Sequence, residues 1–198
     1  MNTANLLTAS RVVIAPFFAL VFILGYKSGA GHYAWVWTCF GLAALIEFTD
    51  FLDGRVARAQ KKVTDFGKVF DPVADSVSRQ TIFISFMVTG IIPLWMYLIF
   101  FYRDAFMQLL RIICASSGVV LAARKSGKAK AVLQGIGTFG VLFVVTLILY
   151  RIPGIPSVIL GFHPGFWVML IPAIFTLMSV IDYVVPNRSL IIKMMQPK

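Results

Sequence analysis

Acidic side chains are scarce in this sequence of 198 residues. Only 8 residues are Asp or Glu, against 18 Lys and Arg, which gives a formal net charge of +10 at pH 7. In a soluble protein this balance would suggest a nucleic-acid partner. The hydrophobic fraction of 59% and the mean hydropathy of +0.87 exclude a typical soluble domain. The excess of Lys and Arg is therefore better explained by the cytoplasmic loops of a membrane protein, and we expect no nucleic-acid partner.

Cysteine and histidine are also rare, with two of each. Cys39 and Cys114 lie far apart in apolar runs, which predicts a structural role and excludes a disulfide framework. His32 and His163 lie singly in separate predicted loops, so we expect neither a haem nor a zinc site. We also expect no cleavable signal peptide, because the first apolar stretch is long and no clear small-residue cleavage site follows it.

Long apolar runs, in contrast, fill most of the chain. Because a bilayer core requires roughly 20 apolar residues per helix, we predict an all-α membrane protein whose six transmembrane helices form a cytoplasm-facing polar cavity. We expect one integral membrane domain over 1–198, with a cytoplasmic segment at 1–11, a tight turn at 90–93 and a helix end at Pro186. The predicted helices cover about 12–26, 33–58, 67–89, 94–123, 131–150 and 166–185.

Lys and Arg are unevenly divided between the predicted loops. Only Lys27 and Arg151 fall on one side of the membrane. The loop cations of the other side are Arg11, Arg55, Arg58, Lys61, Lys62, Lys68, Arg124, Lys125, Lys128, Lys130, Arg188, Lys193 and Lys198. This asymmetry predicts that both chain ends lie in the cytoplasm. Three further arginines, Arg79, Arg103 and Arg111, remain inside predicted helices.

Four aspartates stand at regular spacing in the segment DFLDGRVARAQKKVTDFGKVFDPVAD (50–75). Asp50 and Asp53 are three residues apart, and Asp71 and Asp75 are four apart. On helices, each pair lies on one face, and the linker between them can turn the chain so that the pairs face each other. Unpaired carboxylates near lipid are costly, whereas oxygen ligands suit Mg²⁺ or Mn²⁺. We therefore predict a site for two divalent cations.

Small residues and one arginine accompany these aspartates. Gly54, Ala57 and Gly67 would lie beside the metal face, where the lack of a large side chain lets a bulky ligand approach. Arg58 could bind a phosphate in a bidentate manner. Two alternatives remain open: helix packing for the glycines, and, for the carboxylates, an internal salt-bridge cluster with Arg55, Arg58 and Arg79.

The motif D-x-x-D-G-x-x-A-R-x8-G-x3-D-x3-D resembles the signature of the CDP-alcohol phosphotransferases. Its eight fixed positions are occupied by Asp50, Asp53, Gly54, Ala57, Arg58, Gly67, Asp71 and Asp75. LLTASR (6–11) is similar to the T-x-x-R segment of bacterial phosphatidylglycerophosphate synthases, and DFGKVFDPVAD is similar to another of their segments. Arg103, Arg111 and GKAK (127–130) resemble later elements. The resemblance covers roughly residues 5 to 135.

The resemblance implies transfer of a phosphoalcohol from a CDP-linked donor, usually CDP-diacylglycerol in bacteria, to an acceptor hydroxyl with release of CMP. It implies that Asp75 is the general base and that all four aspartates hold two Mg²⁺ or Mn²⁺ ions. The donor-binding candidates are Thr8, Gly54, Ala57, Arg58 and Gly67. By analogy with the family we also expect a homodimer in the bacterial cytoplasmic membrane, with its active site facing the cytoplasm.

Basic residues in the second half suggest a phosphorylated acceptor. Arg103 and Arg111 are eight residues apart, so they lie on roughly one helix face. Arg111 has no acidic neighbour in sequence, and an arginine within the membrane needs an anionic partner. We expect both arginines, with Lys128 and Lys130, to bind the phosphate of an acceptor such as sn-glycerol 3-phosphate. The alternatives are a local pair with Asp104 for Arg103 and ordinary loop charges for the two lysines.

Two departures from the family pattern leave other acceptors open. Many glycerophosphate-specific relatives have Lys after the last aspartate and Glu after the first arginine, where this chain has Ser76 and Asp104. Inositol phosphate, serine or another polar alcohol therefore stays an alternative. A small divalent-metal transporter, a function of another class, also stays an alternative. A transporter, however, would not require glycines and an arginine at fixed offsets from its carboxylates.

Overall fold

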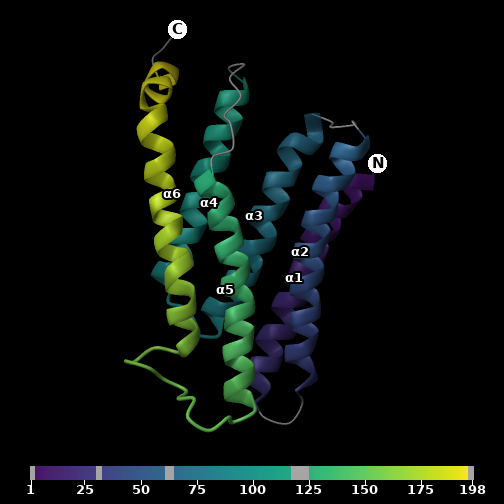
Figure 1. The fold of residues 1–198 in the computed structure, drawn as a ribbon, viewed down its shortest axis with the longest axis vertical. Helices are drawn as coiled ribbons and strands as arrows, with labels where there is room; N and C mark the ends of the chain where they lie inside the picture. Colours follow the sequence, from purple (N-terminus) through teal and green to yellow (C-terminus); the bar gives the residue numbers. More distant parts are fainter. Residues whose placement is uncertain (1–2, 30–32, 61–64, 117–124, 196–198) are drawn as a thin grey trace.

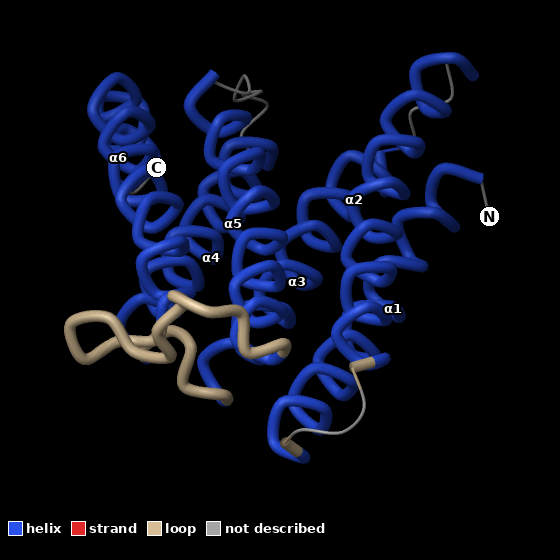
Figure 2. Tube along the Cα trace, turned by 60° about the horizontal axis from the view of Figure 1, so that its bottom comes forward, coloured by secondary structure: helices blue, strands red, loops and turns tan. Residues whose placement is uncertain are grey.

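A computed structural model describes residues 3–29, 33–60, 65–116 and 125–195. Within these ranges the chain forms helices joined by turns and loops, and no strand is present (Figures 1 and 2). The helices are α1 (Thr3–Ser28), α2 (Ala34–Gln60), α3 (Asp65–Val88), α4 (Leu94–Ser116), α5 (Lys125–Leu149) and α6 (Pro164–Met195). The all-α prediction is therefore confirmed.

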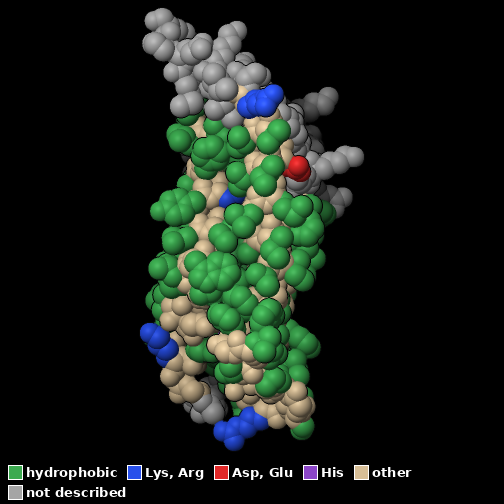
Figure 3. All heavy atoms as spheres, turned by 90° about the vertical axis from the view of Figure 1, so that its left-hand side faces the viewer, with side chains coloured by type: hydrophobic (Ala, Val, Ile, Leu, Met, Phe, Trp, Pro, Cys, Tyr) green, Lys and Arg blue, Asp and Glu red, His purple; other side chains and the backbone are tan. Residues whose placement is uncertain are grey.

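Four of the six helices are long and apolar enough to cross a membrane. These segments are Leu6–Ser28, Ala34–Leu52, Ala129–Leu149 and Pro164–Asp182. On the face drawn in Figure 3, hydrophobic side chains cover the middle of the molecule and Lys and Arg lie mostly toward its two ends. The chain is thus an integral membrane protein. Helices α3 and α4 run beside the four apolar helices (Figure 1), but each carries several charged residues.

The helices alternate in direction, so the charged parts of the sequence meet at one end. The N-terminal end of α1 and the C-terminal end of α6 lie at the end of the bundle where α2 finishes, α3 begins and α5 begins (Figure 1). The opposite end holds the short α3–α4 turn and the long connection 150–163 (Figures 1 and 2). This arrangement agrees with the predicted grouping of the Lys- and Arg-rich segments.

Aromatic side chains form the core between the first three helices. The rings of Phe22 and Phe86 pack edge to face with centroids 5.0 Å apart, and Phe18 stacks beside Phe22. All three side chains are fully buried. Edge-to-face pairs add roughly 1 kcal/mol to the free energy of burial. Helix α1 therefore packs against both α2 and α3 along most of its length.

Glycine permits two close features of the fold. A Cβ on Gly140 of α5 would lie 2.7 Å from Val168 of α6, so only glycine allows these helices to approach this closely. Gly90 has φ of +77° and follows α3, where Ile91 N–H donates to the carbonyl of Phe86 at 2.9 Å. The predicted turn at 90–93 is therefore confirmed.

Three predicted helix ends are wrong. Helix α1 begins at Thr3 rather than near residue 12, and Arg11, predicted to precede the helix, lies within it and finds partners in α2 and α3. Helix α6 continues through Pro186 to Met195, because proline removes one backbone N–H and does not by itself end a helix. Helix α5 begins at Lys125 rather than near 131. The predicted end of the fourth helix, at 117–123, lies outside the described residues.

Candidate functional site

Arg11 joins two of the predicted metal ligands. Its guanidinium donates from Nη1 to Asp50 Oδ1 and from Nη2 to Asp71 Oδ1, the latter at 2.6 Å. The arginine is fully buried, whereas the side chains of Asp50 and Asp71 are 39% and 49% exposed. One buried cation therefore holds carboxylates of α2 and α3 together, where the sequence predicted only that these aspartates could face each other.

Arg79 makes a second junction, one that involves three helices. Its Nε donates to Asp75 at 2.9 Å, one turn earlier on α3, and its Nη1 donates to the carbonyl oxygen of Ala131 on α5 at 2.9 Å. Glu47 of α2 lies 3.5 Å from the same Nη1. The pairing of Arg79 with Asp75 agrees with the salt-bridge interpretation of this arginine, and it fixes the orientation of the carboxylate that the sequence predicts as the base.

The donor atoms at this end suit a hard divalent cation. Asp50, Asp71 and Asp75 offer only oxygen, and each side chain keeps at least a third of its surface exposed. In the part of the chain that the structure describes, no three acidic, Cys or His side chains lie close enough together to form a complete ligand set. The side chain of Asp53 lies outside the described residues. The described carboxylates therefore fit Mg²⁺ or Mn²⁺ in chemistry, and the two-metal site stays a prediction.

The predicted donor-binding residues are described only in part. Gly54, Ala57 and Arg58 belong to the last turns of α2, but their side chains lie outside the described residues. Gly67 is in the first turn of α3 and Thr8 is buried in α1. Thr8 thus lies one turn before Arg11, on the helix that carries the buried guanidinium.

Asp104 gathers donors from three helices. Its Oδ1 accepts from Lys130 of α5 and from Arg103 at 3.0 Å, and its Oδ2 accepts from Ser76 and Gln80 of α3, each at 3.3 Å. Asp104 and Lys130 are only 6% and 5% exposed. Lys130 is therefore a buried helix residue rather than an ordinary loop charge, and the predicted local pair of Arg103 with Asp104 is present.

Ser179 of α6 is a further contact of Arg103. Arg103 Nε donates to the Ser179 hydroxyl at 3.0 Å, while that hydroxyl donates to the carbonyl of Thr176 at 2.7 Å. Since the single hydroxyl proton is used in the second bond, Ser179 acts as an acceptor toward the guanidinium. Two fixed contacts, one on α4 and one on α6, thus orient Arg103.

A cavity of about 90 Å³ lies among these side chains. It is lined by Asp75, Arg79, Arg103, Asp104, Arg111, Lys130 and Gln134, among others. Arg79 and Asp75 neutralise each other, so the remaining lining charges are three cations and one carboxylate, a net charge of +2. The structure therefore brings Arg103, Arg111 and Lys130 to one cavity, whereas the side chain of Lys128 lies outside the described residues.

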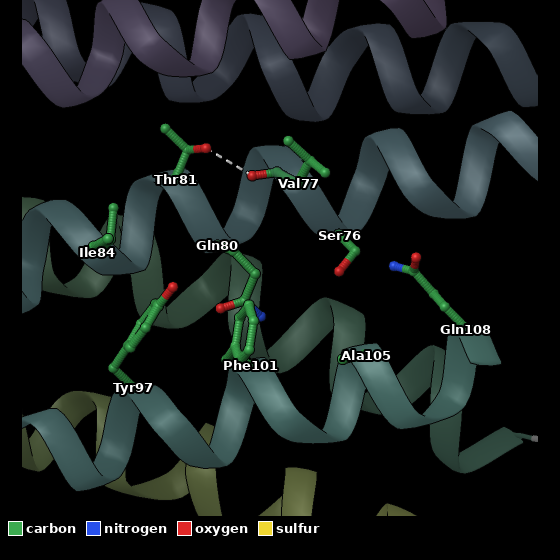
Figure 4. Close-up of a pocket in the computed structure, with 9 residues that line it drawn as sticks. All are labelled: Ser76, Val77, Gln80, Thr81, Ile84, Tyr97, Phe101, Ala105 and Gln108. Atoms are coloured by element: carbon green, nitrogen blue, oxygen red, sulfur yellow. Dashed lines mark hydrogen bonds between the residues drawn. The ribbon is translucent and has the colours of Figure 1, made fainter. Parts of the chain in front are cut away.

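A larger groove of about 290 Å³ runs between α3 and α4 beside this cavity. Figure 4 shows Ser76 and Gln108 facing each other at one end of the groove, with Ile84 and Tyr97 toward the other. Ser76 and Gln108 also line the small cavity. The two spaces therefore share a polar boundary, which lies at the position where the family pattern has Lys and this chain has Ser76.

Sequence reasoning missed Arg11, Glu47, Gln80, Gln134 and Ser179 as parts of the site. Arg11 was grouped with the loop cations, and Glu47 and Ser179 were given no role. The spacing of Glu47, three residues before Asp50, places it on the same helix face and could have indicated its proximity. Arg11 and Ser179 meet their partners only through tertiary packing, which local spacing does not reveal.

Cys39 and His163 are not among the residues that line this site. Cys39 is a buried free thiol in the core, while the side chain of Cys114 lies outside the described residues. His163 lies in the connection before α6, where its Nδ1 accepts from the N–H of Gly165 at 3.0 Å and burial lowers the pKa of its imidazole. This local hydrogen bond gives His163 a structural role, while His32 is outside the described residues.

The chain is similar to known proteins over most of its length. Residues 1–178 match the family model of CDP-alcohol phosphatidyltransferases. A protein of Treponema pallidum named CDP-diacylglycerol–glycerol-3-phosphate 3-phosphatidyltransferase is 33% identical over 136 residues, which cover 66% of this chain and 63% of that protein. The match thus spans a little under two thirds of that relative's length.

For two further relatives, the match covers a larger share of the relative's length. A Mycobacterium tuberculosis protein named "Probable phosphatidylglycerophosphate synthase" is 32% identical over 150 residues, covering 74% of this chain and 67% of that protein. A Bacillus subtilis protein with the same name as the Treponema relative is 28% identical over 162 residues, covering 77% and 79%. All three relatives therefore carry names that describe one reaction.

Proposed function

Because this chain belongs to the CDP-alcohol phosphatidyltransferase family, we propose that it is a phosphatidyltransferase of phospholipid biosynthesis. It transfers the phosphatidyl group of CDP-diacylglycerol to a hydroxyl of sn-glycerol 3-phosphate, forming phosphatidylglycerophosphate and releasing CMP. The names of the relatives from Treponema pallidum, Mycobacterium tuberculosis and Bacillus subtilis support this reaction. The observation that carries the choice of acceptor is the net positive cavity beside Asp75.

The charge of this cavity favours a phosphorylated acceptor. Arg103, Arg111 and Lys130 supply three positive charges and Asp104 one negative charge, so a phosphate monoester dianion would neutralise the cavity. An acceptor without net charge, such as serine, would leave the surplus positive charge of this cavity uncompensated, which is unfavourable in a low-dielectric setting. Lys128 precedes Lys130 by two residues and would add to the same charge.

The aspartates of α2 and α3 would hold the metal and the donor. Asp50, Asp53, Asp71 and Asp75 are the proposed ligands of two divalent cations, Mg²⁺ or Mn²⁺, which when bound would neutralise the pyrophosphate and the departing CMP. The proposed donor-binding residues are Thr8, Gly54, Ala57, Arg58 and Gly67. Arg11 holds Asp50 and Asp71 together from the buried side and leaves their other faces open.

Asp75 would take the proton of the attacking hydroxyl. It lines the cavity that would hold the acceptor phosphate, so a hydroxyl of the same molecule can reach its carboxylate. Arg79 Nε occupies one carboxylate oxygen, Oδ1, which leaves Oδ2 for the substrate. A positioned general base of this kind contributes roughly 10²- to 10⁴-fold to the rate.

The setting of the reaction also belongs to this proposal. We expect one domain over 1–198, a homodimer, and a bacterial cytoplasmic membrane with the site facing the cytoplasm. The grouping of basic segments at the end of the bundle that holds the site supports the orientation. Glycerol 3-phosphate and CMP are water-soluble, so a cytoplasmic opening would admit the acceptor and release the nucleotide product.

One assay tests the reaction and the acceptor together. Purified protein with CDP-diacylglycerol and Mg²⁺ is offered labelled glycerol 3-phosphate, inositol phosphate and serine in parallel, and CMP and the lipid product are identified. We expect phosphatidylglycerophosphate from the first acceptor only. A different lipid product would show that the acceptor is another alcohol, while the class of reaction would stay the same. Absence of CMP with every alcohol would favour the divalent-metal transporter instead.

A further inference from the structure

Gln134 has a buried amide oxygen that the reaction described above does not use. The side chain is fully buried on α5 and lines the small cavity next to Asp75 and Lys130. Its Oε1 has no hydrogen-bond partner within the described residues. A buried carbonyl oxygen left unpaired is unfavourable, so at the wall of a cavity a hydrogen-bond donor from a ligand would be favoured.

The hydrogen bonds around Gln134 fix which end of its amide is left without a protein partner. Thr176 Oγ1 donates its single proton to the carbonyl of Pro172 at 2.7 Å, so this hydroxyl can only accept from Gln134. The group 3.2 Å from Thr176 Oγ1 is therefore the NH₂ of Gln134, and Oε1 lies on the other side of the amide. Rotating the amide by 180° would bring two acceptors together and lose this bond.

We propose that Gln134 is a specificity-determining residue whose Oε1 accepts a hydrogen bond from a second hydroxyl of the acceptor. This inference rests on the proposed function. The acceptor phosphate would be bound by Arg103, Arg111 and Lys130, and its attacking hydroxyl would lie at Asp75, so both ends of the molecule are already assigned. The substrate class becomes a phosphorylated polyol with a free hydroxyl between these ends, such as the C2 hydroxyl of glycerol 3-phosphate.

Two acceptors that differ by this hydroxyl alone provide the test. Glycerol 3-phosphate and 3-hydroxypropyl phosphate share the phosphate and the attacking primary alcohol, and the second compound lacks the C2 hydroxyl. We expect wild-type protein to prefer glycerol 3-phosphate by about 10- to 100-fold in kcat/KM. Gln134→Leu should reduce this ratio to within about threefold of one, because only glycerol 3-phosphate loses a contact.

The ratio separates recognition from folding. Both acceptors are measured on the same preparation, so the fraction of folded enzyme cancels. Thr138→Val is a matched control on α5, since Thr138 is buried and its hydroxyl donates only to the backbone carbonyl of Gln134 at 3.1 Å. This control should keep the wild-type ratio. An unchanged ratio in Gln134→Leu, or equal losses for both acceptors, would overturn the proposal.

Two further variants keep the test decisive should Gln134→Leu not fold. Gln134→Glu keeps an acceptor oxygen at this position and should retain the preference for glycerol 3-phosphate. Thr176→Val removes the bond that orients the amide and should weaken the preference several-fold; no change in that variant contradicts the orientation argument. Wild-type protein that uses glycerol 3-phosphate without any preference overturns this inference alone. Wild-type protein that uses neither acceptor overturns the proposed acceptor as well.

Discussion

The two charged regions of this protein have opposite imbalances of charge: one has more carboxylates than cations, and the other has more cations than carboxylates. In the first region, between α1, α2 and α3, four carboxylates share two cations among the described residues. The members of the first region are Glu47, Asp50, Asp71 and Asp75 with Arg11 and Arg79. In the second region, between α4, α5 and α6, the three cations Arg103, Arg111 and Lys130 line a cavity with Asp104, whose carboxylate pairs with Arg103 and Lys130 among the described residues.

This contrast shows how a membrane protein can prepare for two kinds of ligand. A surplus of carboxylates near lipid is stabilised by added cations, and a surplus of cations is stabilised by an added anion. Each region contains enough internal pairing to fold, through Arg11 in one and Asp104 in the other, and leaves a remainder for the ligand. Arg79 connects the two regions, because it contacts Asp75 and Glu47 while lying in the wall of the second cavity.

The largest expected effect comes from Asp75→Asn. The amide oxygen can still accept from Arg79 Nε, so the fold should persist, but the group no longer takes a proton and is a poorer metal ligand. We expect CMP release to fall by roughly 10³-fold or more. Thermal unfolding measured on the same samples checks the fold. Turnover near the wild-type rate would exclude Asp75 as the base.

Arg11→Gln should weaken the carboxylate-rich region specifically. Loss of the buried cation leaves Asp50 and Asp71 to repel each other, so we expect turnover about 100-fold lower through misplaced ligands. We also expect an unfolding temperature roughly 5 °C lower in EDTA. Mg²⁺ should recover part of this temperature, because a bound cation replaces the missing charge. Lys27→Gln, an exposed change at the far end of α1, is the control.

A drop for Arg11→Gln that is equal in EDTA and in Mg²⁺ would contradict a cation site at these two aspartates. The comparison uses the protein's own stability as its measure, so it does not depend on the identity of the acceptor. Thermal unfolding of detergent-solubilised protein is sufficient.

Arg111→Ala should act on the cation-rich region alone. Removing one of three positive charges at the small cavity should raise the KM for glycerol 3-phosphate about tenfold, with less than about a twofold change in the KM for CDP-diacylglycerol. Arg151→Ala, an exposed change at the opposite end of the bundle, should alter neither constant. Equal increases in both KM values would show that the two regions are not separate binding sites.

The smallest effect is expected from Ser179→Ala. Arg103 loses the acceptor at its Nε but keeps its contact with Asp104, so the KM for glycerol 3-phosphate should rise about threefold. Ser85→Ala is a close control, since Ser85 is also buried and its hydroxyl also donates to a backbone carbonyl three residues earlier. An identical change in both variants would mean that Ser179 has no specific influence on Arg103.

The helices could be predicted from the sequence, because the hydropathy of a segment reflects its contact with lipid. Six helices are present in the described part of the chain, four of them long and apolar enough to span a membrane, and the turn at 90–93 is where Gly90 indicated it. The errors are at the ends of helices, where polar residues were taken as boundaries. Arg11 and Lys130 continue their helices because each meets a carboxylate from another helix, and a single sequence does not display such partners.

For the site, spacing was informative wherever partners lie on one helix. The spacings of Asp50 with Asp53 and of Asp71 with Asp75 predicted a carboxylate-rich centre, and the structure brings Asp50 and Asp71 to one guanidinium. Contacts between helices distant in sequence could not be predicted this way. The bond from Arg103 to Ser179 spans 76 residues, and the orientation of the Gln134 amide depends on α6.

The uneven hydropathy of the six helices has a consequence for biogenesis. Helices α3 and α4 hold most of the site's charges and are joined by a turn of only a few residues, whereas the other four helices are apolar enough to enter lipid singly. Transfer of an unaccompanied charged helix into a bilayer is expensive. We therefore expect α3 and α4 to insert into the membrane together, as a hairpin packed against α1. Insertion of α5 would then bring Lys130 to Asp104 on the other side of the hairpin.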